Sequence, residues 1–258
     1  MKTLKKILFS TLIGVLILSH TSVLAAAIEF SSTPLFSDPD LVAYYKLEDA
    51  TDEIGTNDLT NNGSTPFNAA LFNNGADGEA KGSGNYLDTG TNFTAAYDTP
   101  TSWFGWVKVI TEGQAELGLD TYTFRANPGR GWHMRYENNG GNPRIHFRLD
   151  TSGSDAQSEN HSITLGTTDW HLLGFTSDGT TLINYVDGVA VSAGITLSGT
   201  MNVTQPTAIG DGVMTSAGGA FHDDYFVFKR VLTPTEVASI YSGNFPAARK
   251  KPGIIMFN

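Results

Sequence analysis

A basic and aromatic cluster in the middle of the chain holds the side chains best suited to bind a ligand. It consists of Arg125, Arg130, Trp132, His133, Arg135, Tyr136, Arg144, His146 and Arg148. Five of the chain's 16 lysines and arginines thus lie within 24 consecutive residues. Arginine pairs with carboxylates through parallel hydrogen bonds, and aromatic rings offer flat faces for stacking. This chemistry predicts a site for an acidic sugar.

The spacing within this cluster is that of β-strands. Successive side chains of a strand point to opposite faces, so Arg144, His146 and Arg148 share one face while residues 145, 147 and 149 face a core. The predicted ligand-binding residues are Arg130, Trp132, His133, Arg135, Arg144, His146 and Arg148. The alternative is that these side chains only balance nearby acids on a solvated sheet face.

The acidic residues lack the arrangement that glycoside hydrolysis requires, which is a pair of carboxylates at a defined separation. Glu48 and Asp52 lie in a turn-rich segment, and Glu116 and Asp120 are not on an alternating strand. No Gly-x-Ser-x-Gly nucleophile elbow occurs. We therefore predict no catalytic residues.

Composition excludes several classes of protein. The 258 residues include no cysteine, so there is no thiolate zinc site, disulfide or cysteine nucleophile. The formal net charge of −10 repels phosphate backbones, so we expect no nucleic-acid partner. The 28 glycines, together with 15 Phe, nine Tyr and four Trp, favour many turns around an aromatic, β-rich core.

The first 25 residues have the pattern of a secretory signal peptide. Three lysines at positions 2, 5 and 6 precede an apolar run over residues 7–18, and small residues follow near position 25. The apolar run is shorter than the ~20 residues that span a membrane. The pattern predicts export to the cell surface or medium, with no stable membrane span after signal removal.

Short alternating or apolar runs, separated by Gly, Asn, Asp and Ser, predict an all-β domain. The expected strands are 41–47, 102–110, 121–125, 133–136, 145–149, 162–165, 171–176, 181–186, 189–193, 208–209 and 221–228. Trp103, Trp106 and Trp170 adjoin apolar positions and are expected in the core. Trp132 lies among glycines, and we expect it to be exposed.

Two local signals fix the ends of elements. Asp187-Gly188 between two β-rich runs predicts a two-residue hairpin turn, within a three-stranded meander over residues 171–191. Thr233 as a cap, followed by Pro234 and Glu236, predicts one short helix. Residues 26–40 are expected to be an extended linker, 41–243 a single domain, and 244–258 a frayed tail or, alternatively, a docking tail.

Five segments, in this order, resemble the laminin-G-like domains of the concanavalin-A-like lectin/glucanase superfamily. They are residues 41–48, 52–59, 102–108, 169–176 with the 185–188 hairpin, and 209–210 with 221–233. The resemblance implies an all-β fold: a two-sheet antiparallel jelly-roll sandwich with one short C-terminal helix. The glucanases of this superfamily carry alternating acids on one strand, which this chain lacks. The fold also hosts lectins, adhesion modules and spacers, so it does not define a function.

The resemblance also implies a place for a metal ion. The first and last strands of such a jelly roll are neighbours, which would bring Glu48 and Asp52 near Asp223 and Asp224. Ca²⁺ takes six to eight oxygen ligands, and related domains often hold one. We predict these four acids as ligands of a structural Ca²⁺. The alternative is that Glu48 and Asp52 are solvated loop acids and that Asp223 or Asp224 caps a strand end.

These patterns predict a secreted, non-catalytic domain of the laminin-G-like type that binds a glycan or another cell-surface component. One alternative is a polysaccharide lyase or hydrolase of the same fold. A lyase would draw its base from Tyr136 or His146 and its charge-neutralising groups from the arginines. A second alternative is a structural subunit of a cell-surface assembly.

Overall fold

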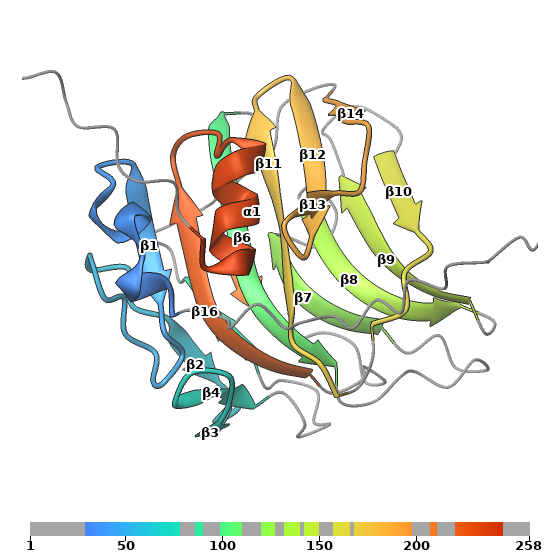
Figure 1. Ribbon diagram of the computed structural model, residues 1–258. Helices are drawn as coiled ribbons and strands as arrows, with labels where there is room; N and C mark the ends of the chain where they lie inside the picture. Colours follow the sequence, from blue (N-terminus) through green and yellow to red (C-terminus); the bar gives the residue numbers. More distant parts are fainter. Residues whose placement is uncertain are drawn as a thin grey trace, which may run out of the picture.

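A computed structural model of the chain describes residues 29–77, 86–89, 99–109, 120–126, 132–139, 142–149, 157–165, 168–197, 207–210 and 220–244. In these residues two antiparallel sheets pack face to face, and a helix and two short turns cover one of them (Figure 1). No helix in the described part of the chain is long and apolar enough to cross a membrane.

Sheet A has the strand order β13-β12-β11-β6-β16-β4-β3, with β1 paired to β16 and β14 paired to β12. Its strands are β1 (Leu41–Tyr45), β3 (Phe67–Ala69), β4 (Asn74–Asp77), β6 (Pro100–Val109), β11 (His171–Asp178), β12 (Thr181–Val186), β13 (Val189–Ala190), β14 (Ile195–Thr196) and β16 (Ala220–Phe228). The first and last long strands, β1 and β16, are therefore neighbours, as the resemblance implied.

Sheet B has the strand order β10-β9-β8-β7-β15-β5-β2. Its strands are β2 (Thr60–Asn62), β5 (Tyr86–Asp88), β7 (Asp120–Ala126), β8 (Trp132–Asn139), β9 (Asn142–Leu149), β10 (Gln157–His161) and β15 (Thr207–Ile209). The chain crosses between the sheets several times, as expected for the predicted jelly roll.

The core between the sheets follows the alternation of side chains along each strand. Trp103 of β6 and Phe175 of β11 point inward from sheet A, and Phe147 of β9 points inward from sheet B. The rings of Phe147 and Phe175 lie 5.8 Å apart across this core. The prediction of a buried Trp103 is confirmed, and Trp106 is buried on the other face of β6.

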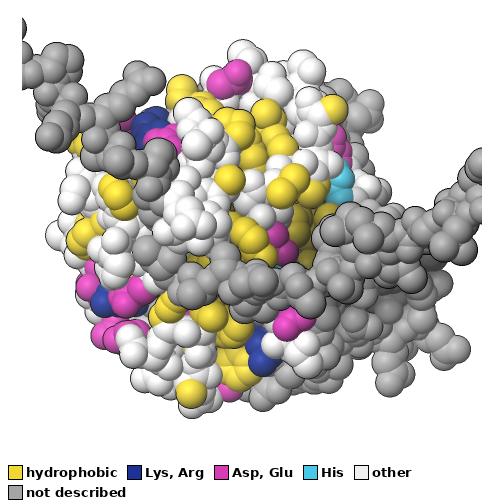
Figure 2. Space-filling view, in the orientation of Figure 1, with side chains coloured by type: hydrophobic (Ala, Val, Ile, Leu, Met, Phe, Trp, Pro, Cys, Tyr) yellow, Lys and Arg dark blue, Asp and Glu magenta, His cyan; other side chains and the backbone are white. Residues whose placement is uncertain are grey.

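A second apolar layer covers the outer face of sheet A. The 3₁₀ turns η1 (Phe30–Ser32) and η2 (Pro34–Ser37) and the helix α1 (Pro234–Ser242) form this layer (Figure 1). Phe30 stacks on Phe226 of β16 at 4.2 Å between ring centroids. In the space-filling view from this side, hydrophobic side chains show between polar ones (Figure 2). Strand β16 is buried along almost its whole length because both of its faces are covered.

The locally encoded elements form as predicted. Thr233 caps α1 in a capping box with Glu236, and Gly243 ends the helix with φ +69°. Strands β11, β12 and β13 form the predicted meander, in which Asp187 and Gly188 both have positive φ at the hairpin turn. Positive φ at both central positions is what a two-residue hairpin of this type requires.

Three features differ from the sequence predictions. Residues 30–37 are packed 3₁₀ turns and not the expected extended linker. Strand β10 lies at 157–161, whereas 162–165 was expected, because its sequence is polar throughout and shows no apolar alternation. The short strands β2, β3, β4, β5 and β14 were not predicted. Such strands carry too few apolar residues for a period-two signal.

Candidate functional site

Asp223 and Asp224 lie at a β-bulge in the middle of β16. Asp223 is opposite Trp106 and Phe226 is opposite Phe104, so β16 holds one residue more than β6 between these pairs. Asp224 has φ +46°. The bulge breaks the alternation of side chains, and both carboxylates thereby reach residues packed on the outer side of sheet A.

The two carboxylates of the bulge are buried and bound to protein donors. Asp224 accepts hydrogen bonds from the Tyr44 hydroxyl at 2.6 Å and the Phe30 amide at 2.8 Å. Asp223 Oδ2 accepts one from the Phe72 amide at 2.7 Å, while its Oδ1 is buried without a partner among the described residues. Burial raises the pKa of Asp223 to about 8 and that of Asp224 to about 7.

The other two predicted metal ligands follow β1, which pairs with β16, but serve different contacts. Asp52 is buried and accepts hydrogen bonds from the backbone amides of Tyr44, Ile54 and Asn57. Glu48 is exposed and accepts one from the Asn73 side chain at 2.8 Å. Asp52 thus closes its own loop through backbone donors.

The acids do not form a complete cation cage with their present contacts. Among the described residues, no group of three or more His, Cys, Asp or Glu side chains is placed to hold a metal ion. The observation that favours a cation is the buried Asp223 Oδ1, which lacks a hydrogen-bond partner in the part of the chain that the structure describes. Calcium at Glu48, Asp52, Asp223 and Asp224 therefore stays a prediction.

The predicted ligand-binding residues fall on neighbouring strands of sheet B. Arg135 lies opposite His146, and His146 lies opposite Asn160, so these residues form one row across β8, β9 and β10. His133, Arg148 and Ser158 form the next row. The neighbours of His146 on β9, residues 145 and 147, point into the core, so His146 points to the outer face.

The structure describes only part of this cluster. Arg144 is half-buried, and His146 is only 8% exposed. Arg130 and the side chains of Trp132, His133, Arg135 and Arg148 lie outside the described residues. The backbone register therefore confirms that the basic residues share rows, while their side-chain contacts stay untested.

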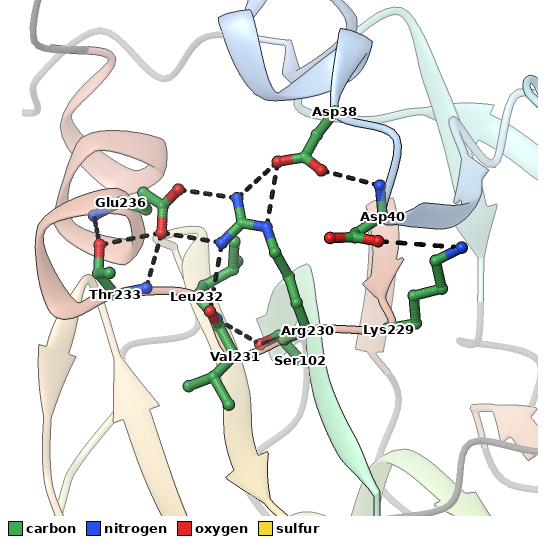
Figure 3. Close-up of polar contacts among 9 residues, drawn as sticks. All are labelled: Asp38, Asp40, Ser102, Lys229, Arg230, Val231, Leu232, Thr233 and Glu236. Atoms are coloured by element: carbon green, nitrogen blue, oxygen red, sulfur yellow. Dashed lines mark hydrogen bonds and ion pairs between the residues drawn. The ribbon is translucent and has the colours of Figure 1, made fainter. Parts of the chain in front are cut away.

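Arg230 connects two pieces of the layer on sheet A, the segment after η2 and the helix α1 (Figure 3). Its guanidinium donates to Asp38 after η2 and to Glu236 of α1, each at 2.7 Å from Nη2. The hydrogen bond to Glu236 raises the pKa of Arg230, so the group stays charged. This pair of ion pairs holds the N-terminal turns and the helix at the end of β16. Its role is structural.

Sequence reasoning missed a polar cluster where the two sheets meet at an open edge. Asn184 of β12 donates from Nδ2 to Glu159 Oε2 of β10 at 3.2 Å, and His161 Nε2 lies 3.2 Å from the same oxygen. One signal was present in the sequence. Asn184 occupies an inward position between Leu182 and Val186, where the alternation predicts an apolar residue.

The chain belongs to the concanavalin A-like lectin/glucanases superfamily, because the model of that family matches residues 81–238. This match and the two-sheet architecture confirm the resemblance and the fold class predicted from the five segments. No curated protein matches the sequence.

Solved structures share this fold at low sequence identity. The binding domain of Paraclostridial Mosquitocidal Protein 1 has a TM-score of 0.66 at 12% identity, covering 79% of this chain and 52% of that one. The binding domain of botulinum neurotoxin serotype G has a TM-score of 0.62 at 15% identity, covering 78% and 50%. This chain therefore spans about half the length of the toxin binding domains.

A third solved structure is covered over almost all of its own length. It is domain 4 of AbnA, a GH43 extracellular arabinanase from Geobacillus stearothermophilus, in complex with arabinotriose. The TM-score is 0.60 at 17% identity, and the match covers 78% of this chain and 98% of that domain. At these identities the three likenesses establish the fold.

Proposed function

We propose that this chain is a secreted, non-catalytic carbohydrate-binding or adhesion domain of the laminin-G-like type. The observation that carries the proposal is the difference between the outer faces of the two sheets. The outer face of sheet A is covered by an apolar layer that includes Phe30 and Ile240. The outer positions of sheet B include Arg144, His146 and Asn160, whose hydrogen-bonding groups suit a glycan.

The solved structures support a binding role. Domain 4 of AbnA was solved with arabinotriose, and this chain covers almost all of that domain. The toxin structures are binding domains. The N-terminal 25 residues support export, which would place the domain where extracellular glycans occur. The absence of an alternating acid strand in the sequence supports a role without catalysis.

We also propose that a structural calcium ion binds beside the bulge of β16. Asp223 would supply its Oδ1, which has no hydrogen-bond partner among the described residues, and Asp224, Asp52 and Glu48 are the other predicted ligands. A hard divalent cation there would stabilise the ionised forms of Asp223 and Asp224, which burial disfavours by raising their pKa.

A glycan array on the chain without its predicted signal peptide tests the binding proposal. We expect retention of a small set of oligosaccharides and no release of new reducing ends from them. The double variant Arg144→Gln/His146→Gln should weaken binding at least about tenfold. Lys229→Gln is the matched control, since it removes one exposed cation from sheet A.

Two results would contradict the proposal. Absence of binding to neutral and acidic oligosaccharides alike would remove the glycan function. Release of reducing ends or unsaturated products from a polysaccharide would instead support the alternative of a hydrolase or lyase.

A further inference from the structure

The open edge between the two sheets holds an oriented carboxylate. Strand β12 of sheet A faces β10 of sheet B along one side of the sandwich (Figure 1). Glu159 Oε2 accepts a hydrogen bond from Asn184 Nδ2 of the other sheet at 3.2 Å. His161 Nε2 lies 3.2 Å from the same oxygen. Glu159 Oε1 has no hydrogen-bond partner in the described part of the chain. We call these three residues the edge cluster.

The edge cluster sits directly outside an aromatic wall of the core. Phe175 of β11 lies opposite Asn184, and Phe147 of β9 lies opposite Glu159. The two Phe rings are 5.8 Å apart, so they close the core behind the polar side chains. Solvent reaches the cluster through two of its side chains, since that of Glu159 is 27% exposed and that of His161 is 14% exposed.

Asn184 is a costly residue at its position. Its side chain is fully buried and lies between the core residues Leu182 and Val186. Its Oδ1 has no hydrogen-bond partner within the described ranges. Burying an unsatisfied amide oxygen destabilises the fold, and an apolar side chain would avoid this cost. The Asn184 amide does hold Glu159 Oε2 in place through its hydrogen bond. Local violations of the folding pattern of this kind mark functional positions.

Strand β10 also borders the outer face of sheet B. Glu159 and His161 lie opposite Phe147 and Ile145 of the core, whereas the exposed Asn160 lies opposite the outward-facing His146. One strand thus contributes alternate residues to the edge cluster and to the rows of sheet B. A ligand that crosses the edge at β10 would contact both.

We propose that the edge cluster is a subsite for a neutral sugar unit. Glu159 Oε1 accepts a sugar hydroxyl, His161 makes a second hydrogen bond to the same unit, and Asn184 is a positioning residue for Glu159. The carboxylate excludes uronic acids by charge repulsion, in contrast to the arginine-bearing rows. The inference rests on the proposed glycan-binding function and gives it a site and a class of sugar.

The experiment compares binding and stability in the same variants. Neutral pentose and hexose trisaccharides and galacturonate and glucuronate trisaccharides are titrated calorimetrically into the chain without its predicted signal peptide. We expect a neutral trisaccharide to bind, and Glu159→Gln to weaken its affinity at least tenfold. Glu53→Gln removes an exposed carboxylate elsewhere and should leave the affinity unchanged.

Asn184→Leu gives the distinguishing result. It should raise the melting temperature, because it removes a buried unsatisfied oxygen, and still weaken neutral-sugar binding. A purely structural Asn184 would change stability alone, and unchanged affinity in both Asn184→Leu and Glu159→Gln overturns the inference. If uronate trisaccharides bind and neutral ones do not, the proposed function stands and the subsite is wrong. If none of the oligosaccharides binds, the proposed function fails as well.

Discussion

The outer faces of the two sheets differ although both sheets share one inner core. On sheet A the outer side chains of β6 and β16 include Phe104, Trp106, Phe226 and Phe228, and residues from both ends of the domain cover them. On sheet B the described outward residues of β9 and β10 include Arg144, His146 and Asn160. The comparison teaches that a sandwich needs only one buried interface, and that the second layer on sheet A is an addition that stabilises it. The proposed glycan-binding residues lie on the other face.

Phe30 should be the most sensitive residue of the covered face. It is 1% exposed and stacks on Phe226, so Phe30→Ala leaves a cavity under η1. We expect a loss of roughly 3–5 kcal/mol in the free energy of unfolding. Urea unfolding followed by tryptophan fluorescence measures it. Wild-type stability would mean that the N-terminal turns do not seal sheet A.

Gly174 tests how tightly the same face is packed. A Cβ at this position would lie 2.1 Å from the Trp103 carbonyl oxygen and 2.3 Å from the Phe104 ring. The carbonyl is backbone and cannot move aside, so Gly174→Ala should destabilise by about 3 kcal/mol. The exposed Val189→Ala on the neighbouring hairpin is the control, with an expected change below about 0.5 kcal/mol. Equal melting temperatures for the two variants would contradict this packing.

The effect of calcium on the melting temperature should depend on residues of sheet A and not on those of sheet B. At a concentration 100 times the dissociation constant, a bound ion stabilises by about 2.7 kcal/mol. We therefore expect calcium added after EDTA to raise the melting temperature. Asp223→Asn or Asp224→Ala should abolish this rise, and Arg144→Gln on sheet B should keep it. A melting temperature that neither EDTA nor calcium changes would contradict the prediction of a structural calcium ion.

The acids of the bulge predict a pH dependence in the absence of metal. Burial raises the pKa of Asp223 to about 8 in the folded chain, from 3.8. The folded state therefore holds its proton more tightly, and this contribution to stability is lost as the pH rises from about 4 to 8. Asp223→Asn stays neutral, so in EDTA its melting temperature should fall less than that of the wild type between pH 5 and pH 8.

His222 has the opposite effect on the pH dependence of stability, and it is present in both the wild type and Asp223→Asn. Burial lowers its pKa to about 4, which favours the folded state as the pH rises toward 6.5. The difference between wild type and Asp223→Asn cancels this contribution. If the two proteins have parallel pH profiles, Asp223 is already ionised when folded.

The smallest effect on stability is expected on sheet B. Arg144 is half-buried and belongs to neither apolar cluster, so Arg144→Gln should change the free energy of unfolding by less than about 1 kcal/mol. Together with weakened glycan binding, this would separate the recognition face from the stabilised one. A large loss of stability would place Arg144 in the structural framework.

Much of the fold could be predicted because its signals are local. The helix α1 begins at Thr233 and Pro234 and ends at Gly243, all within eleven residues. The Asp187-Gly188 turn and the burial of Trp103 follow from short patterns in the same way. The candidate site was predicted less well. The register of β8 and β9 aligns the basic residues as expected, and β1 and β16 are neighbours as the metal prediction required. The bulge at Asp224, which turns two adjacent carboxylates to the same side of β16, had no signal in the sequence.

By itself, the sequence determined the class of fold, the ends of its helix and central hairpin, and the apolar identity of its core strands. These depend on turn chemistry, capping and periodicity between near neighbours. Only the tertiary structure decided that Phe30 covers Phe226, that Asp224 binds Tyr44, and that Asn184 meets Glu159. The first two pairs join residues more than 150 positions apart, and the third joins the two sheets. Such pairs form only once strand order and register bring them together, and no local pattern in the chain specifies that.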